Sequence, residues 1–204
     1  MNSAITVAIT GASGARYGLR LLEQLVKTQK PIYVLISTAA RKVIPLETEL
    51  QLPTQAAHIQ AVLTEYYQAK PGQLQVFAQR QWLAPVASGS AVPQAMVICP
   101  CTSGTLAAIA QGLSRNLIER AADVVLKERR KLILVHRETP LALTHLENML
   151  RLTQMGAMIL PANPGFYHHP QRIEDLIDFI VARILDHLGI HHSLLPRWGA
   201  AYDD

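Results

Sequence analysis

The sequence is poor in cysteine and has no long apolar run. Its two cysteines, Cys99 and Cys101, stand one residue apart, a spacing that disfavours a disulfide, and no second pair of residues lies at zinc-ligand spacing. No apolar stretch could span a bilayer, and the first residues lack the basic region and apolar core of a signal peptide. We therefore expect a cytoplasmic protein with no membrane segment, whose cysteines are small residues at a strand end.

Positive charge is too scarce for a nucleic-acid-binding protein. The formal net charge is only +4, and aromatic residues, 5% of the chain, are not interleaved with basic ones. The basic run at residues 127–131 is typical of a helix C-terminus, where cations suit the dipole. Arg120, Asp123 and Lys127 fall on one helical face and could be a solvated, ion-paired stripe. The small excess of positive charge could still attract an anionic ligand.

Histidine does not follow a metal-binding pattern. His168 and His169 are adjacent, and neighbouring histidines rarely aim at one ion. His187, His191 and His192 lie near an expected helix end, where the dipole favours histidine. We expect no metal site.

What the sequence does contain is a regular alternation of strands and helices. Half of the residues are apolar and 17% are charged, which suits one domain with a sizeable core. We expect strands at residues 5–10, 32–36, 74–77, 95–99, 132–135 and 157–160, and helices around 19–26, after 105, and at 56–66, 117–129, 141–155 and 173–188. This α/β pattern predicts a single-domain, Rossmann-like, doubly wound and mostly parallel sheet over residues 1–190, with a functional tail at 191–204.

Ligands of such sheets bind beyond the C-terminal ends of the strands, where this chain has a Gly-rich turn at residues 10–14. Its glycines allow a tight turn, and the helix N-terminus that follows offers free amides to a phosphate. The second strand ends in Ser37 and Thr38 rather than the acid that a dinucleotide site needs, and Gly-x-Gly-x-x-Gly spacing is missing. A mononucleotide such as FMN fits better than NAD, and a plain βα turn is the alternative.

Two further motifs follow strands at the same expected edge. Residues 102–105 supply three hydroxyls and a glycine at a helix start, which could be an ordinary N-cap or part of a polar crevice. Arg137 and Glu138 come directly after the 132–135 strand. They could form a surface ion pair; alternatively, the carboxylate could transfer protons while the guanidinium holds phosphate or flavin oxygens.

At these motifs the sequence resembles the UbiX family of flavin prenyltransferases. The likeness extends from residue 5 to residue 198. It is carried by seven segments in order, at residues 10–14, 87–90, 97–101, 116–123, 126–130, 137–140 and 164–168.

The resemblance implies a metal-independent enzyme that joins a dimethylallyl group to N5 and C6 of reduced FMN. It implies that FMN is held by Gly11, Ala12, Ser13, Ser37, Thr102, Ser103, Gly104, Thr105 and Arg137. It assigns dimethylallyl phosphate to Tyr167 and Arg183, with help from Arg120, Lys127, Ser88 and Gly89. The implied catalytic positions are Ser13, Glu47, Lys127, Glu138 and Trp198.

The resemblance also implies an assembly and a partner. Family members are expected to be homododecamers with active sites between subunits, and to hand prenylated FMN to a UbiD-type decarboxylase, often in ubiquinone biosynthesis. Two departures stand out, because His136 replaces a frequent Pro, and Thr102-Ser103 inverts the usual order. Neither removes a required hydroxyl or charge, so we expect them to alter loop stiffness. The rival interpretations are an FMN-dependent decarboxylase of cysteine-containing substrates and a non-catalytic flavin carrier.

Overall fold

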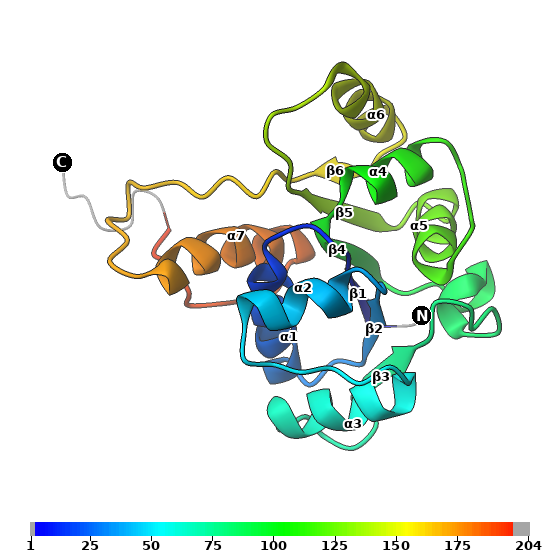
Figure 1. The fold of residues 1–204 in the computed structure, drawn as a ribbon, viewed down its shortest axis with the longest axis horizontal. Helices are drawn as coiled ribbons and strands as arrows, with labels where there is room; N and C mark the ends of the chain where they lie inside the picture. The colour runs from blue at the N-terminus through cyan, green and yellow to red at the C-terminus, as the bar shows by residue number, and fades with distance from the viewer. Residues whose placement is uncertain (1–2, 198–204) are drawn as a thin grey trace.

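The computed structural model describes residues 3–197, and in it six strands pair into one sheet in the order β3-β2-β1-β4-β5-β6 (Figure 1). The strands are β1 (Ile5–Ile9), β2 (Ile32–Ile36), β3 (Leu74–Phe77), β4 (Ala95–Cys101), β5 (Lys131–His136) and β6 (Met158–Ile159). Each of the five strand pairings in the described chain is parallel. The predicted doubly wound α/β fold is therefore confirmed.

Helices cover both faces of the sheet because side chains alternate along each strand. The helices of the described chain are α1 (Ala15–Lys27), α2 (Ala40–Glu47), α3 (Ala56–Tyr66), α4 (Ser103–Ala110), α5 (Leu117–Lys127), α6 (Leu143–Gln154) and α7 (Ile173–Leu188). Val7 of β1 points into the core shared with α1, α2, α3 and α7, whereas Ala8 points into the core shared with α4, α5 and α6. Within residues 3–197, no helix has the length and apolarity to cross a bilayer.

The predicted elements match the observed ones closely, with one omission. The bounds of β2, β3 and α3 coincide with the prediction, and β4 runs two residues further, through Cys101. Helix α2 was not predicted, because Pro45 lies inside it and only Ala40 and Ile44 are buried, too few to produce a helical period. Helix α7 ends at Leu188, and the predicted division of the chain after residue 190 remains a prediction.

The strand order reverses between β1 and β4, which is where such folds bind their ligands. The hydroxyl of Thr10 ties these two strand ends together, since it donates to the carbonyl of Pro100 at 2.8 Å and accepts from the amide of Thr102 at 2.9 Å. The amide of Arg137, just past β5, donates to the carbonyl of Cys101 at 3.3 Å. The turns after β1, β4 and β5 therefore meet at one edge of the sheet.

Candidate active site

The N-terminus of α1 is occupied by a side chain. The amide of Gly14 donates to both carboxylate oxygens of Glu47 at 3.0 Å, and the amide of Ala15 donates to Oε2 at 2.8 Å. The prediction of free amides here was therefore wrong for these two groups, because the unpredicted helix α2 ends at Glu47 and supplies the anion that a helix N-terminus favours. Glu47 therefore lies beside the Gly-rich turn, and its catalytic role remains a prediction.

The Gly-rich turn packs closely against the start of α2. A Cβ at Gly11 would overlap the Cβ of Ala39, and Gly14 has a φ of 103°, which side chains rarely adopt. Ser13 is exposed in the same turn. The hydroxyl of Ser37 accepts from the amide of Ala40 at 3.0 Å and so helps to begin α2. Gly11 is thus required by protein packing before any ligand is considered.

The second turn leaves its helix N-terminus open. The hydroxyl of Thr102 accepts from the amide of Thr105 at 3.1 Å, so Thr102 is the N-cap of α4, the role that the sequence offered as the alternative to a ligand crevice. Within residues 3–197, the amides of Ser103 and Gly104 make no hydrogen bond, and a Cβ at Gly104 would meet nothing within 4 Å. Arg137, exposed beside this turn, forms no ion pair in the same part of the chain. An anion could be bound here.

The charges of Glu47 and Arg137 both act on the side chain of Tyr17 in α1. Burial, the neighbouring Cys99 and the charge of Glu47 raise the pKa of Tyr17, while the charge of Arg137 lowers it. Glu47 from α2 and Arg137 from the end of β5 therefore both lie near the first turn of α1. Arg137, predicted to bind flavin, and Glu47, predicted to be catalytic, are therefore brought to the same helix end by the fold.

A chain of hydrogen bonds joins α4 to the end of β5. The hydroxyl of Ser103 donates to Oε2 of Glu138 at 2.7 Å and lies 3.0 Å from Nε2 of His136. The hydrogen bond from Ser103 is the main cause that lowers the pKa of Glu138 below its usual range. His136 is 2% exposed, and burial followed by the neighbouring His145 lowers its pKa. The sequence interpretation expected His136 to affect loop stiffness and overlooked its ring as part of this edge.

A second group of predicted residues lies on α5, against a loop built from two short helical turns, Pro85–Ala87 and Gly89–Ala91. Nε of Arg120 donates to the carbonyl of Ala87 at 3.1 Å. A Cβ at Gly89 would lie 2.8 Å from Nζ of Lys127. The predicted phosphate-binding residues Arg120, Lys127, Ser88 and Gly89 are therefore neighbours in the chain's own fold.

Tyr167 and Arg183 lie elsewhere. They line a cavity of about 380 Å³ together with His168, Phe179, Asp186 and His192. Arg183 pairs with Asp186 at 2.7 Å. Figure 1 shows α7 and the segment that precedes it on one side of the molecule and α5 on the other. Within one chain these two residues therefore lie apart from Arg120 and Lys127, and their shared role in binding the donor remains a prediction. Trp198 lies outside the described residues.

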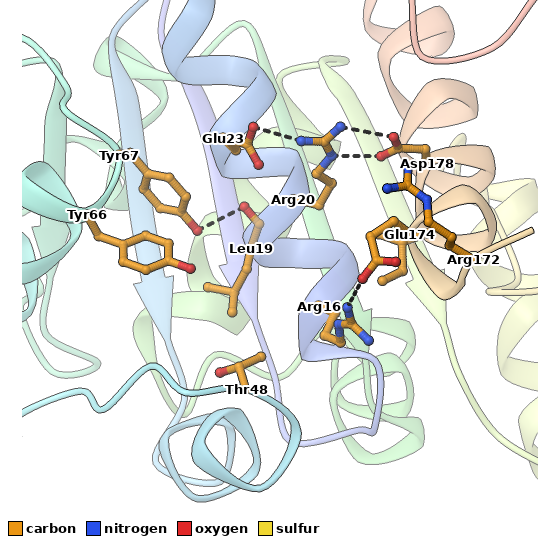
Figure 2. A pocket seen from close by; sticks show the side chains of 11 residues that line it. Arg16, Leu19, Arg20, Glu23, Thr48, Tyr66, Tyr67, Arg172, Glu174 and Asp178 are labelled. Carbon is orange, nitrogen blue, oxygen red and sulfur yellow. Dashed lines mark hydrogen bonds and ion pairs between the residues drawn. The ribbon is translucent and has the colours of Figure 1, made fainter.

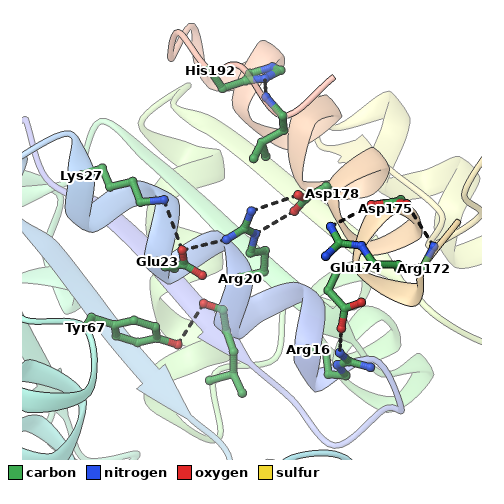
Figure 3. Close-up of polar contacts among 12 residues, drawn as sticks. Arg16, Arg20, Glu23, Lys27, Tyr67, Arg172, Glu174, Asp175, Asp178 and His192 are labelled. Carbon is green, nitrogen blue, oxygen red and sulfur yellow. Dashed lines mark hydrogen bonds and ion pairs between the residues drawn. The ribbon is translucent and has the colours of Figure 1, made fainter. Parts of the chain in front are cut away.

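Another cavity, of about 310 Å³, lies between α1 and α7 and contains none of the predicted site residues (Figure 2). Arg20 binds both carboxylate oxygens of Asp178, at 2.7 and 2.9 Å, and Arg16 pairs with Glu174 at 2.7 Å. Figure 3 shows these pairs as a network that fastens the two helices to each other. Its charges balance, so we regard it as structural. Within residues 3–197, no group of three metal-ligating side chains could hold an ion.

Comparisons with known proteins identify the family. The sequence model described as Flavoprotein matches residues 1–185. The flavin prenyltransferase UbiX of Pseudomonas aeruginosa is 60% identical over 195 residues, which cover 96% of this chain and 93% of that protein.

Solved structures agree with the sequence comparisons. AnUbiX (PadA1), in complex with FMN and dimethylallyl pyrophosphate, is similar with a TM-score of 0.87 and 39% identity, covering 99% of this chain and 100% of that one. A dodecameric FMN-dependent UbiX-like decarboxylase from Escherichia coli O157:H7 is similar with a TM-score of 0.84 and 38% identity. The match covers 97% of this chain and 100% of that one. The chain belongs to the UbiX family of flavin prenyltransferases.

Proposed function

We propose that this chain transfers the dimethylallyl group of dimethylallyl phosphate to N5 and C6 of reduced FMN. The observation that carries the proposal is the hydrogen bond between Ser103 and Glu138 beside the open N-terminus of α4. This hydrogen bond places an ionised carboxylate next to a helix N-terminus that suits an anion. Both lie at the edge of the sheet where this fold binds ligands. The similar AnUbiX structure contains FMN and dimethylallyl pyrophosphate, which supports this choice of substrates.

The residues at the strand ends fit a flavin mononucleotide. The amides of Ser103 and Gly104, which have no hydrogen-bond partner among the described residues, and the open space at Gly104 suit a phosphate. The guanidinium of Arg137 can bind oxygens in a fork. Ser37 and the turn at residues 11–13 would hold the rest of the molecule. Reduced FMN supplies the nucleophilic nitrogen and the ring carbon that receive the prenyl group.

The cations of α5 suit the phosphate of the donor. Arg120 is oriented by Ala87 and by an ion pair with Asp123 at 2.7 Å, and Lys127 pairs with Glu128. Fixed cations stabilise the charge on a departing phosphate without reorganisation when the bond breaks. Ser88 and Gly89 would form the wall beside them.

Tyr167 and Arg183 would complete the donor site from a neighbouring subunit. Two observations support this step: within one chain they lie apart from α5, and a structure 38% identical to this chain is described as dodecameric. We therefore propose a homododecamer whose active sites lie between subunits. Closed assemblies of this kind place different patches of each chain in contact.

Glu138 would take the proton that leaves C6 of the flavin when the second bond closes the new ring, and the prenyl double bond consumed in that step would gain a proton on its other carbon. The carboxylate is ionised at neutral pH, which is the form that accepts a proton, while its lowered pKa makes it a weaker base than an ordinary glutamate. Glu47 would set the Gly-rich turn through Gly14 and Ala15, with Ser13 presented from that turn. We further propose that the product, prenylated FMN, serves a UbiD-type decarboxylase, on the ground of family function.

Mass spectrometry of the flavin tests the proposal. Purified protein is incubated without oxygen with reduced FMN and either dimethylallyl phosphate or dimethylallyl diphosphate, and the extracted flavin is weighed. We expect a flavin heavier by one prenyl group with the monophosphate. Unmodified flavin with both donors would overturn the proposal. Release of CO₂ from a peptide ending in cysteine would then indicate the decarboxylase, and bound but unchanged flavin the carrier.

A further inference from the structure

His136 is the last residue of β5, and its ring is enclosed by neighbouring elements. Its backbone pairs with Cys101 of β4, and its ring lies 6.1 Å, between centroids, from the ring of His145 on α6. Nε2 of His136 lies 3.0 Å from the hydroxyl oxygen of Ser103, which in turn lies 2.7 Å from Oε2 of Glu138. Three polar side chains from two elements thus form one continuous chain.

The donors in this chain can be assigned from the chemistry of its groups. An ionised carboxylate only accepts hydrogen bonds, and a serine hydroxyl has one proton to donate. Because Ser103 gives that proton to Glu138, its oxygen must accept from His136. The neutral ring of His136 is therefore the tautomer with hydrogen on Nε2.

The charges around the chain favour this arrangement at neutral pH. Burial lowers the pKa of His136, His145 on α6 lowers it further, and Glu138 opposes them. Burial raises the pKa of Cys101 on β4 to about 12, so that thiol stays neutral. At the Glu138 end of the chain of hydrogen bonds, the pKa of the carboxyl is lowered by four neighbours, namely Ser103, the backbone of Thr139, His145 and His136. Neutral His136 thus faces ionised Glu138 across Ser103.

We infer that His136 is a positioning residue that holds the hydroxyl of Ser103 in the orientation that donates to Glu138. The inference rests on the proposed function, because the orientation of Glu138 affects turnover only if this carboxylate takes a proton. Without the donor at His136, the hydroxyl of Ser103 can rotate to other acceptors. Glu138 then loses a directed hydrogen bond to its charged form and is harder to keep ionised.

Two substitutions separate positioning from packing. His136→Phe keeps an aromatic ring, although a larger one, and removes the donor, whereas His136→Gln keeps an N–H donor on a chain of similar reach. His58→Phe, at an exposed histidine of α3, is the matched control. Product formation is measured against pH for each variant, together with FMN affinity and the KM of dimethylallyl phosphate.

We expect His136→Phe to lower kcat about tenfold through misplacement of Glu138. We also expect the acid limb of its pH profile of product formation to move to a higher pH by about half a unit or more. The reason is that the pKa of Glu138 rises when a donor to its charged form is lost. His136→Gln should recover most of both effects. FMN affinity and donor KM should stay within about twofold of the unsubstituted protein, since His136 is not expected to touch either substrate.

A double-mutant cycle with Ser103→Ala tests the route through Ser103. We expect the losses of His136→Phe and Ser103→Ala to be strongly non-additive, as for residues of one network. Additive losses, or an unchanged acid limb in His136→Phe, would overturn the inference. If His136→Phe does not fold, His136→Asn, whose shorter amide falls short of Ser103, takes its place in both assays. Failure of the unsubstituted protein to prenylate flavin would instead overturn the proposed function.

Discussion

The amide of Gly14 donates hydrogen bonds to both carboxylate oxygens of Glu47, each at 3.0 Å. This contact joins the end of α2 to the beginning of α1 across the Gly-rich turn. It means that the turn is shaped by the protein itself, and that the amides of Gly14 and Ala15 are occupied by a side chain of the same protein.

Glu47→Ala should destabilise the protein by about 1–2 kcal/mol, because the first amides of α1 lose their acceptor and the dipole loses its anion. For a chain of this size that corresponds to a Tm lower by roughly 2–8 °C. Thermal unfolding in the absence of ligand measures it, with Glu49→Ala, an exposed residue just past α2, as the control. Equal Tm values for the two variants would contradict the capping role.

Gly11→Ala should destabilise the protein through contact with Ala39 rather than through a ligand. The added methyl overlaps the Cβ of Ala39, and overpacking of this kind costs about 1–3 kcal/mol. Chemical denaturation of the ligand-free protein measures the loss. A second substitution, Ala39→Gly, should restore much of it in the same chain; no recovery would place the clash elsewhere.

Arg183→Ala should retain FMN and weaken the binding of dimethylallyl phosphate. Removal of a desolvated charged contact to a phosphate costs roughly 2–5 kcal/mol, which is about 30-fold or more in affinity. Titration calorimetry with each ligand checks this. Arg172→Ala, an exposed arginine at the start of the same helix, is the control. Unchanged donor affinity in Arg183→Ala would remove Arg183 from the site.

Mixed oligomers should show whether the donor site lies between subunits. Arg183→Ala and Arg120→Ala are each expected to be inactive. When both chains are co-expressed, about a quarter of the sites should combine two unsubstituted halves, because each site takes one half from each of two neighbours. Activity that stays at the level of the single variants would mean that both arginines act within one chain or that the chains do not assemble.

Glu138→Gln should bind FMN and donor almost normally while product formation slows roughly 10²–10⁴-fold, because the amide cannot accept a proton. The lowered pKa of Glu138 predicts the pH dependence of the unsubstituted enzyme. The carboxylate stays ionised above that pKa, so activity should persist at neutral pH and fall only as pH drops through a value below the usual range of glutamate. Loss of FMN binding in Glu138→Gln would indicate a structural role instead.

The parts of this molecule that the sequence predicted are those where local pattern and tertiary environment agree. The apolar runs of β1, β2, β4 and β5 are largely buried on both faces, so their composition alone marks them, and the motifs after them lie at the sheet edge because the strands do. Helix α2 has no such pattern, and the capping role of Glu47 was missed with it.

Two other features depend on contacts between segments far apart in sequence. The ring of His136 joins the site only because Ser103, 33 residues earlier, begins a helix beside it. Tyr167 and Arg183 can join Arg120 and Lys127 only between subunits, because α7 and α5 pack on opposite faces of the sheet. Residue type indicates phosphate binding in both groups, but the face of the sheet on which each helix packs decides which groups meet.

The most direct test of the account is the mass of the flavin released after the protein has been incubated with reduced FMN and dimethylallyl phosphate, followed over time for the unsubstituted protein and Glu138→Gln. The account predicts flavin heavier by one prenyl group, formed roughly 10²–10⁴-fold more slowly by Glu138→Gln. A flavin whose mass never changes in the unsubstituted protein would contradict it.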